Sequence, residues 1–327
     1  MSETAVPAPA HAEPAFVEPI GHGIHVVDTG FHRPLFDAAY LLVERGRAAF
    51  VDTGTNHAVP RLLAALESTG VGVDAVDYVI PTHVHLDHAG GAGLLMQQLP
   101  NARLVVHPRG ARHLVDPGHL VKSATSVYGA AEIDRSYGRI VPVPAERVVA
   151  TRDGMTIELA GRPLFFLDTP GHAMHHHCIW DAASRAFFTG DTFGLSYRDF
   201  DTDAGPWIMP TSTPVQFQPQ ALRRSIERML ASTPTHMHLT HYGRVGDVAR
   251  LGALLLGQLD EMVAVARATP RGADRHPALL RDLEAIHLRS LRAHGVTLSE
   301  ARIHELLALD LELNAQGIAI WLDRGRA

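Results

Sequence analysis

A short stretch of the chain, residues 82–91, constrains the fold more than any other. It reads Thr-His-Val-His-Leu-Asp-His-Ala-Gly-Gly and follows a short hydrophobic run, residues 76–80. That run is rich in β-branched residues and ends at a proline, which predicts a buried strand. The polar stretch holds four potential metal ligands within six residues: His83, His85, Asp87 and His88. Because a loop at a strand end can direct several side chains at one point, we expect a functional site here.

The spacing of these four residues predicts two neighbouring metal sites. Imidazole nitrogen suits zinc, iron and nickel, and a carboxylate adds a hard oxygen ligand and negative charge. In an extended segment His83, His85 and Asp87 share one face, whereas His88 points elsewhere. A single ion could therefore not easily take all four. The competing interpretation is a surface cluster of histidines without a ligand role.

Length, charge and cysteine content exclude several classes of protein. With 327 residues, the chain can form one large domain with an appendage, or two domains. A formal net charge of −6 and a pI near 6.4 give no general attraction for nucleic acid or an anionic membrane. Cys178 is the only cysteine, which excludes an intrachain disulfide and a cysteine-based zinc site.

The start of the chain has no targeting pattern. Residues 1–19 are rich in Ala, Pro and Glu and lack both the basic start and the apolar centre of a secretory signal. They predict a poorly ordered tail. No segment approaches the ~18 uninterrupted apolar residues that a membrane helix needs. We therefore expect a cytoplasmic protein.

Strand patterns alternate with helical patterns through the first three quarters of the chain. The predicted strands are residues 24–27, 38–43, 48–51, 76–80, 103–106, 155–159, 163–167, 177–181, 185–189 and 235–239. The predicted helices between them are residues 59–66, 90–99 and 219–230. The mostly helical segment 108–142 is a candidate wall or lid of a substrate site.

The character of the sequence changes after about residue 245. Apolar residues at spacings of three and four predict helices over residues 251–266, 278–293 and 298–311, and residues 318–322 fit either helix or strand. We expect a helical C-terminal domain that carries no chemistry of its own.

Polar residues recur where predicted strands end. In chain order they are Asp52, the cluster at 83–88, His172, Asp191 and His241. His236 and His238 compete with His241, but they lie within the last strand rather than at its end. Several of these residues lie in short sequence motifs: Phe-Val-Asp-Thr-Gly at 50–54, Thr-Pro-Gly-His at 169–172 and Phe-Thr-Gly-Asp-Thr at 188–192. This ordered set resembles the metallo-β-lactamase-fold superfamily, over roughly residues 20–245.

The resemblance implies a fold and a domain organisation. The fold is of the α/β (α+β) class, a four-layer αββα sandwich formed by residues 20–245. Residues 246–327 then form the helical C-terminal domain, and residues 1–19 the tail. Such an appendage is also similar to that of the glyoxalase II-like branch of the superfamily.

The resemblance also implies ligands for two metal ions. His83, His85 and His172 would hold the first ion; Asp87, His88 and His241 would hold the second, and Asp191 would bridge them. Asp52 would orient these ligands through hydrogen bonds. Two close divalent ions lower the pKa of a shared water and supply hydroxide near neutral pH. Zinc is the favoured metal, with iron or manganese as alternatives.

These expectations point to a metallo-hydrolase in which Asp87 and Asp191 are the catalytic carboxylates. The bridging hydroxide would attack a small carbonyl substrate, a thioester, ester or lactone. The chain lacks a convincing copy of the basic glutathione-binding pattern of glyoxalase II. Lactonases of this fold carry a tyrosine three residues after the bridging aspartate; here that position is Gly194, and Tyr197 is the nearest substitute.

Other activities of the superfamily remain as alternatives. A mononuclear iron enzyme similar to persulfide dioxygenases, with iron on His83, His85 and His172, shares these motifs, and so do phosphodiesterases. A nuclease conflicts with the acidic balance of the chain. Flavin-linked relatives would need a carboxylate in place of His85, and true β-lactamases usually lack an aspartate at position 87. A non-enzymatic metal-binding role would leave Asp191 without a purpose.

The substrate pocket is the least constrained part of the prediction. Candidates from the two long loops are Tyr128, Tyr137, Tyr197, Trp207 and Met209, and core packing explains each almost as well. The family pattern does not require His175, His176 and His177. Strand packing or solvation is their expected role, and the alternative is that one of them donates to a ligand or lines the pocket. We expect a small-molecule substrate, no nucleic acid and no membrane as partners, and a homodimer is left open.

Overall fold

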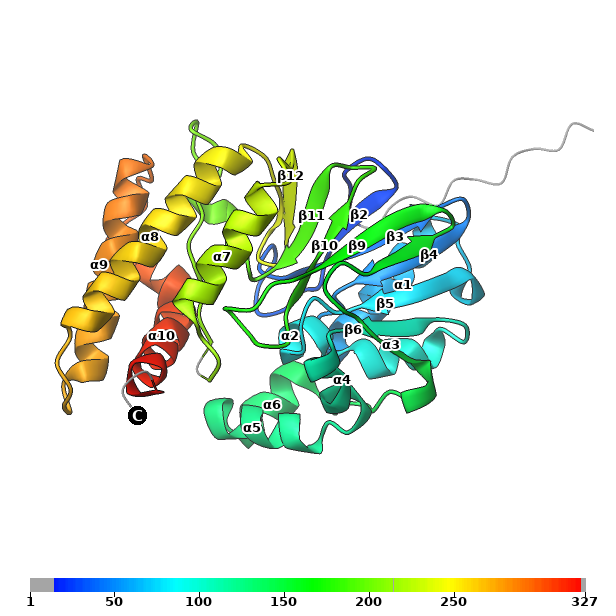
Figure 1. Cartoon of the computed structure of the whole chain (residues 1–327), viewed down its shortest axis with the longest axis horizontal. Coiled ribbons are helices and arrows are strands. Elements are labelled where there is room, and N and C mark those ends of the chain that lie inside the picture. The colour runs from blue at the N-terminus through cyan, green and yellow to red at the C-terminus, as the bar shows by residue number, and fades with distance from the viewer. Residues whose placement is uncertain (1–14, 214, 325–327) are drawn as a thin grey trace, which may run out of the picture.

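The computed structural model describes residues 15–213 and 215–324, apart from the side chains of residues 127 and 128. Two mixed β-sheets lie face to face, with helices on both outer sides and a group of long helices at one end (Figure 1). This is the predicted αββα arrangement with a C-terminal helical region. Within the described residues, no helix is long and apolar enough to cross a membrane.

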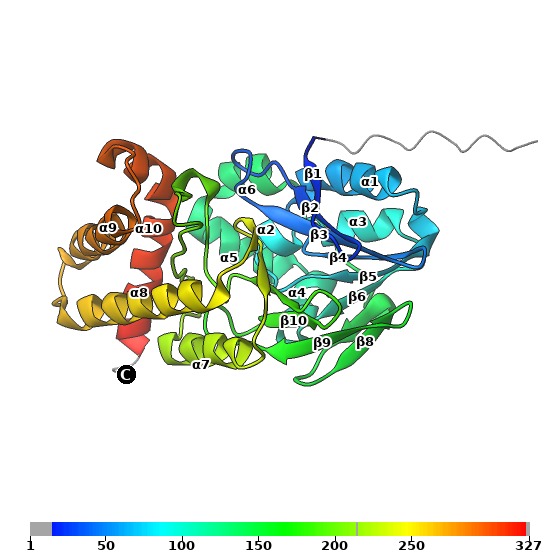
Figure 2. The same cartoon turned by 90° about the horizontal axis from the view of Figure 1, so that it is seen from above.

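The first sheet has seven strands in sequence order. They are β1 (Val17–Pro19), β2 (Ile24–Asp28), β3 (Ala38–Glu44), β4 (Arg47–Val51), β5 (Val76–Ile80), β6 (Arg103–Val106) and β7 (Val148–Ala150). The strands from β1 to β4 pair antiparallel, and those from β4 to β7 pair parallel. The parallel half is connected through helices α1 (Val59–Ser68) and α3 (Ala92–Gln98), which cover its outer face (Figure 2).

The second sheet has six strands, in the order β13-β12-β11-β10-β9-β8. Their bounds are β8 (Thr156–Leu159), β9 (Arg162–Asp168), β10 (His177–Asp181), β11 (Ala186–Gly190), β12 (His236–Leu239) and β13 (Gly243–Val245). Only β11 and β12 pair parallel, and the chain crosses between them through α7 (Pro219–Leu230). Strands β9, β11 and β12 therefore run in one direction and end at the same edge.

Alternation along the strands separates the hydrophobic layers. On β3, Leu42 faces the second sheet while Leu41 faces the helices; on β11, Phe188 faces the first sheet while Phe187 faces α7 and α8. All four side chains are almost completely buried. Period-two alternation in the sequence thus builds a core between the sheets and a second core under each helical layer.

Residues 108–142 form three short helices beside the first sheet. They are α4 (Pro108–Val115), α5 (Gly118–Tyr128) and α6 (Ala130–Tyr137). Tyr137 at the end of α6 packs against Phe31, with 5.4 Å between ring centroids. The predicted helical character of this segment is therefore confirmed.

The C-terminal region consists of α8 (Val248–Ala268), α9 (Arg275–Ala293) and α10 (Glu300–Arg324). One continuous hydrophobic cluster joins these helices to the second sheet, with Leu255 and Leu307 in the same cluster as Met237. Residues 318–322, for which the sequence left helix and strand open, belong to α10. This helix is continuous through Gly317, where it packs directly against residues 212 and 213.

Three short or edge strands were not predicted: β1, β7 and β13. Each has only three residues, too few to show an alternating pattern. Strand β1 also corrects the prediction of a poorly ordered tail over residues 1–19, since Val17–Pro19 pairs with β2. Residues 1–14 lie outside the described part of the chain.

Candidate metal centre

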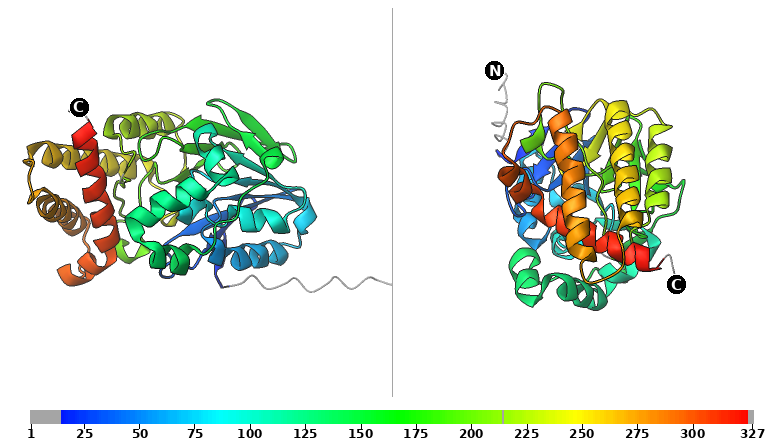
Figure 3. Two further views of the ribbon diagram at one scale, coloured as in Figure 1. Left: turned by 90° about the horizontal axis from the view of Figure 1, so that it is seen from below. Right: turned by 90° about the vertical axis from the view of Figure 1, so that its left-hand side faces the viewer.

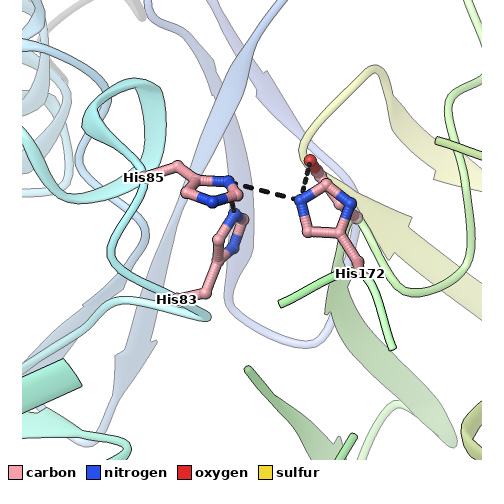
Figure 4. A group of neighbouring side chains, drawn as sticks. His83, His85 and His172 are labelled. Carbon is pink, nitrogen blue, oxygen red and sulfur yellow. Dashed lines mark hydrogen bonds and ion pairs between the residues drawn. The ribbon is translucent and has the colours of Figure 1, made fainter. Parts of the chain in front are cut away.

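Five strand ends deliver the predicted ligands to one edge of the sandwich. Strands β4 and β5 lead to Asp52 and to residues 81–88, and β9, β11 and β12 lead to His172, Asp191 and His241. Because parallel strands end on the same side, residues more than 150 positions apart meet there. Figure 4 shows the rings of His83, His85 and His172 pointing toward one another.

The first group of potential ligands contains His83, His85, His172 and Asp191. Nε2 of His83 lies 2.7 Å from Nδ1 of His85, which lies 3.3 Å from Nε2 of His172. Nε2 of His172 is also 3.3 Å from Oδ2 of Asp191. One ligand atom of each residue lies within 4.8 Å of the others.

The second group contains Asp87, His88 and His241. Oδ2 of Asp87 lies 3.7 Å from Nε2 of His88 and 3.5 Å from Nε2 of His241. Asp191 approaches this group too: its Oδ1 is 3.3 Å from His88 Nε2 and 3.7 Å from His241 Nε2. The two carboxylate oxygens of Asp191 therefore face different groups.

These distances fit the coordination of two metal ions. Two ligand atoms that are each ~2.1 Å from one tetrahedral zinc ion lie about 3.4 Å apart. Most of the contacts above are close to that value. In addition, Nε2 of His88 and Oδ1 of Asp191 are buried and, although only 3.3 Å apart, neither forms a hydrogen bond of good geometry, which is rare for a buried polar atom. A metal ion would supply the missing partner of both atoms.

In three of the histidines, Nε2 faces the site and the other ring nitrogen, Nδ1, contacts an oxygen of the surrounding chain. Nδ1 of His88 donates to Oδ2 of Asp52 at 2.9 Å, and Nδ1 of His241 donates to the carbonyl of Phe36 at 2.9 Å. Nδ1 of His172 lies 3.4 Å from the carbonyl of Thr211. Such bonds fix the ring tautomer and leave Nε2 free for an ion.

Asp52 lies where the resemblance implies, beside a ligand rather than among the ligands. It follows β4 in the left-handed conformation, with φ of 56°, and is almost fully buried. Its carboxylate accepts hydrogen bonds from the backbone N–H and the hydroxyl of Thr82, from Thr240 Oγ1 and from His88. Asp52 thereby ties the ends of β4, β5 and β12 together.

Burial keeps the histidines of the first group neutral. Burial, reinforced by the imidazoles of His88 and His85, holds the pKa of His83 well below its usual range. Burial likewise lowers the pKa of His85 to about 3. A neutral imidazole offers its lone pair to a metal ion at physiological pH.

Negative charge dominates the second group. Burial opposes protonation of His88, but the carboxylates of Asp191, Asp87 and Asp52 outweigh it and raise its pKa well above the usual value. Burial also opposes protonation of His241, but the carboxylates of Asp191 and Asp87 outweigh it and raise the pKa of His241 to about 10. This surplus of carboxylate charge favours a bound cation.

The geometric reason that we gave for two sites is wrong, although the grouping is as the resemblance implies. We expected an extended segment in which His83, His85 and Asp87 share one face. The chain instead turns into helix α2 (Leu86–Ala89) directly after His85. Asp87 is thereby separated from His83 and His85 and joins the second group.

His176 lies within the site, although strand packing or solvation was the role expected for it. Its ring stacks on His83 with 4.7 Å between centroids, and its Nε2 accepts a hydrogen bond from the backbone N–H of Asp191 at 3.3 Å. Its Nδ1 contacts the hydroxyls of Thr169 and Thr192. The available signal was its position four residues after His172 and directly before β10, which pairs with β11, the strand that leads to Asp191.

The predicted pocket residues divide into two kinds. Trp207 and Met209 are fully buried in the hydrophobic core, and Trp207 donates its indole N–H to Ser290 Oγ. This corrects their assignment to a pocket, because core packing accounts for them. Tyr137 and Tyr197 are also almost fully buried, but Tyr197 stacks on Phe36 near His241. The side chain of Tyr128 lies outside the described part of the structure.

The remaining histidines of the last strand take no part in either group. His238 packs against Tyr40 and Phe188, and the side chain of His236 contacts Thr235. Cys178 is fully buried, and burial raises the pKa of its thiol to about 12, as expected of a small core residue. Among the described residues, only the two groups above bring three or more potential ligands together.

Comparison with known proteins gives a consistent family. The chain is 24% identical over 228 residues to the metallo-beta-lactamase fold-containing protein ST1585 of Sulfurisphaera tokodaii, covering 68% of this chain and 79% of that protein. It is 32% identical over 145 residues to a hydroxyacylglutathione hydrolase of Synechococcus sp., covering 44% of this chain and 43% of that enzyme.

Solved structures share the fold at lower identity. The crystal structure of ST1585 superposes with a TM-score of 0.61 at 23% identity, covering 84% of this chain and 99% of that one. The metallo-beta-lactamase family protein TTHA1429 of Thermus thermophilus gives 0.62 at 22% identity, covering 86% and 94%. The family model described as the metallo-beta-lactamase superfamily matches residues 32–234. With its two sheets and its strand-end histidines and aspartates, the chain belongs to the metallo-beta-lactamase superfamily.

Proposed function

We propose that the protein is a dinuclear metal-dependent hydrolase of a small carbonyl substrate: a thioester, ester or lactone. The observation that carries this proposal is the position of Asp191 between the two groups. One carboxylate oxygen is 3.3 Å from His172 and the other is 3.3 Å from His88. A carboxylate that presents one oxygen to each group could ligate an ion in both of them.

Two divalent ions held here would supply a hydroxide nucleophile near neutral pH and polarise the carbonyl oxygen of the substrate. The chain's own residues prepare that chemistry. Asp52 and the carbonyl of Phe36 keep Nε2 of His88 and His241 directed at the site. Asp87 is the more exposed of the two site carboxylates, and the nearby imidazoles of His88 and His241 lower its pKa against the effect of burial. It stays ionised and can orient an attacking water by accepting its hydrogen bond.

Two observations favour a thioester or ester over a lactone. The hydroxyacylglutathione hydrolase relative is named for thioester-type chemistry on an acylated thiol. Position 194, where lactonases of this fold carry a tyrosine, admits no side chain in this protein. A Cβ on Gly194 would lie 2.3 Å from the carbonyl oxygen of Met209, and φ there is 77°.

The test joins metal analysis with a substrate panel. The chain is expressed in medium containing zinc, iron and manganese, and its metals are counted by elemental analysis. Turnover is then measured with a thioester, an aryl ester, a lactone, a phosphodiester and a persulfide. We expect two metal equivalents per chain and hydrolysis of a carbonyl substrate, with the thioester or ester ahead of the lactone.

A matched pair of variants ties the activity to the site. Asp191→Asn should abolish turnover, whereas Asp168→Asn, which alters a carboxylate paired with His107 outside both groups, should leave it intact. One iron per chain with oxygen consumption on the persulfide would overturn the hydrolase in favour of the dioxygenase-like alternative. Turnover of the phosphodiester alone would overturn the carbonyl substrate.

A further inference from the structure

One face of helix α10 approaches the candidate metal centre through three buried positions. Asp310, Asn314 and Gly317 are spaced by four and three residues, so they lie along one side of the helix. Asn314 is fully buried and Asp310 nearly so. Figures 2 and 3 show α10, in red, between α9 and the rest of the molecule. The two polar side chains among them, Asp310 and Asn314, each bond to a part of the chain that leads to a histidine of the site.

Asn314 forms hydrogen bonds with residues 210–212, which belong to the segment that contacts His172. Its Oδ1 accepts a hydrogen bond from the backbone N–H of Ser212 at 2.7 Å, and its Nδ2 donates to the carbonyl of Pro210 at 3.4 Å. Ser212 Oγ also donates to the Asn314 carbonyl at 3.3 Å. A side-chain amide that binds both a donor and an acceptor of one peptide segment fixes the position of that segment.

The same segment contacts His172 at two places. The carbonyl of Thr211 lies 3.4 Å from Nδ1 of His172, and Thr213 Oγ1 donates to the His172 carbonyl at 3.0 Å. Gly317 brings the helix backbone close to this segment, since a Cβ there would lie 2.4 Å from the carbonyl oxygen of Thr213. The ring and the backbone of His172 are therefore both braced from α10.

Asp310 supports His241 by a different route. Its carboxylate accepts a hydrogen bond from the hydroxyl of Tyr197, at 3.1 Å and 3.3 Å from the two oxygens. The Tyr197 ring stacks on Phe36 with 5.2 Å between centroids and an interplanar angle of 14°. Phe36 in turn accepts the hydrogen bond from His241 Nδ1 and presents its ring to the His241 imidazole.

We infer that α10 is a positioning element for both metal groups, in which Asn314 sets His172 and Asp310, through Tyr197 and Phe36, sets His241. The inference rests on the proposed two-metal centre, since the histidines matter here as ligands. Neither Asn314 nor Asp310 belongs to the ligand groups, so each acts through the residue that it holds. Partners of metal-bound histidines typically change metal affinity by about 10- to 100-fold when they are removed.

The experiment measures the two metal affinities separately. Zinc is added stepwise to the metal-free full-length chain in competition with a chelator of known affinity, which gives a dissociation constant for each equivalent. His172→Ala and His241→Ala identify which equivalent belongs to which group. Asn314→Ala should weaken the His172 equivalent by about 10-fold, the lower end of the range for a direct partner of a ligand, because it acts through the Thr211 carbonyl; the other equivalent should stay nearly unchanged. Asp310→Ala and Tyr197→Phe should act mainly on the His241 equivalent.

Two further variants separate positioning from general stability. Leu283→Ala creates a cavity in the fully buried core of α9, and no hydrogen bond joins Leu283 to the segments above. It should lower the melting temperature as much as Asn314→Ala or more, without changing either zinc affinity. Asp310→Asn keeps an acceptor for the Tyr197 hydroxyl and should restore most of the affinity that Asp310→Ala loses.

The outcomes distinguish this inference from the proposed function. If the unmodified chain binds two zinc equivalents and Asn314→Ala and Tyr197→Phe bind them with unchanged affinities, the helix has only a packing role. The same conclusion follows if Leu283→Ala weakens zinc binding as strongly as Asn314→Ala. If the unmodified chain binds fewer than two equivalents, the two-metal centre itself is overturned, whatever the variants do.

Discussion

Asp191 shows how much of the site depends on the placement of single residues. It follows Gly190, the last residue of β11, whose φ is 46° and whose missing Cβ leaves room for Thr82 and His176. Its backbone N–H is held by His176, which leaves the carboxylate to lie between the two groups. A glycine at the strand end and a buried histidine thus direct one carboxylate at two groups.

Asp191→Asn should remove this bridge. An amide has one oxygen, so it can serve one group at most, and its NH2 would face the other. We expect the affinity of at least one metal equivalent to fall by on the order of 100-fold or more and turnover to disappear. The measurement is elemental analysis after dialysis against a weak chelator. Retention of two equivalents with full activity would contradict the bridging assignment.

Asp52→Asn tests the residue that orients His88. The amide would turn an NH2 group toward one of the donors that Asp52 now accepts, those of Thr82, Thr240 and His88. We expect metal affinity to fall by about 10- to 100-fold and the free energy of unfolding by about 1–3 kcal/mol, since a buried donor loses its acceptor.

The control for Asp52→Asn is Asp181→Asn. Asp181 is also fully buried, but it pairs with Arg162 at the far end of the second sheet. It should cost stability in urea unfolding while both metal equivalents bind normally. Equal metal losses in the two variants would show that Asp52 has no particular role in the site.

At the scale of elements, close backbone contacts decide where helices sit on the sheets. Gly93 in α3 lies against residue 141 in the segment that leads to β7, and a Cβ on it would be 1.9 Å from the carbonyl oxygen of Val141. Helix α3 directly follows α2, which carries Asp87 and His88. The distance of α3 from the first sheet therefore also affects where these two side chains lie.

Gly93→Ala should therefore destabilise the fold despite the better helix propensity of alanine. The backbone of α3 or of residue 141 must move, and overpacking of this kind typically costs about 1–3 kcal/mol. Gly257→Ala in α8 is the matched control, because a Cβ there meets nothing within 4 Å. That variant should gain about 0.5–1 kcal/mol. Thermal unfolding of both variants in chelator measures the difference, and equal shifts would contradict the predicted contact.

At the scale of the whole molecule, the protein buries many neutral histidines, and folding must keep them unprotonated. His287 of α9 is one that lies far from the metal groups; it is fully buried and its Nδ1 contacts Oε1 of Gln258. Burial lowers its pKa from 6.5 to about 4. The unfolded chain therefore takes up a proton below pH 6.5 that the folded chain accepts only near pH 4. The free energy of unfolding thus decreases as the pH is lowered from 6.5 to 4.

His287→Gln should reduce this acid sensitivity. Between pH 7.5 and 5.0 the unmodified chain should lose about 2 kcal/mol more free energy of unfolding than the variant, because one pKa unit corresponds to about 1.4 kcal/mol. Urea unfolding of the metal-free chain at both pH values measures this loss. His304→Gln, at an exposed position of α10, should behave like the unmodified chain. An identical pH dependence in all three proteins would contradict the role of His287.

Much of the fold could be predicted from the sequence because the patterns that indicate its strands and helices are local. The strand runs, the helix periodicity after residue 245 and the polar residues at strand ends are each contained in a few consecutive residues. The three-residue strands and the continuous α10 were not predicted, because pairing with a neighbour or packing against a distant loop decided them. Trp207 and Met209, which were candidates for the substrate pocket, are buried in the core by tertiary packing.

The sequence by itself determined which residues could bind metal and in what order along the chain, since each follows a strand whose pattern is local. The resemblance implied how these residues divide into two groups, but only the tertiary structure supplied the physical reason, because the turn into α2 after His85 redirects Asp87. Tertiary structure alone also revealed the support from α10. Asn314 and Ser212 are 102 positions apart, and no local pattern records a hydrogen bond across that distance.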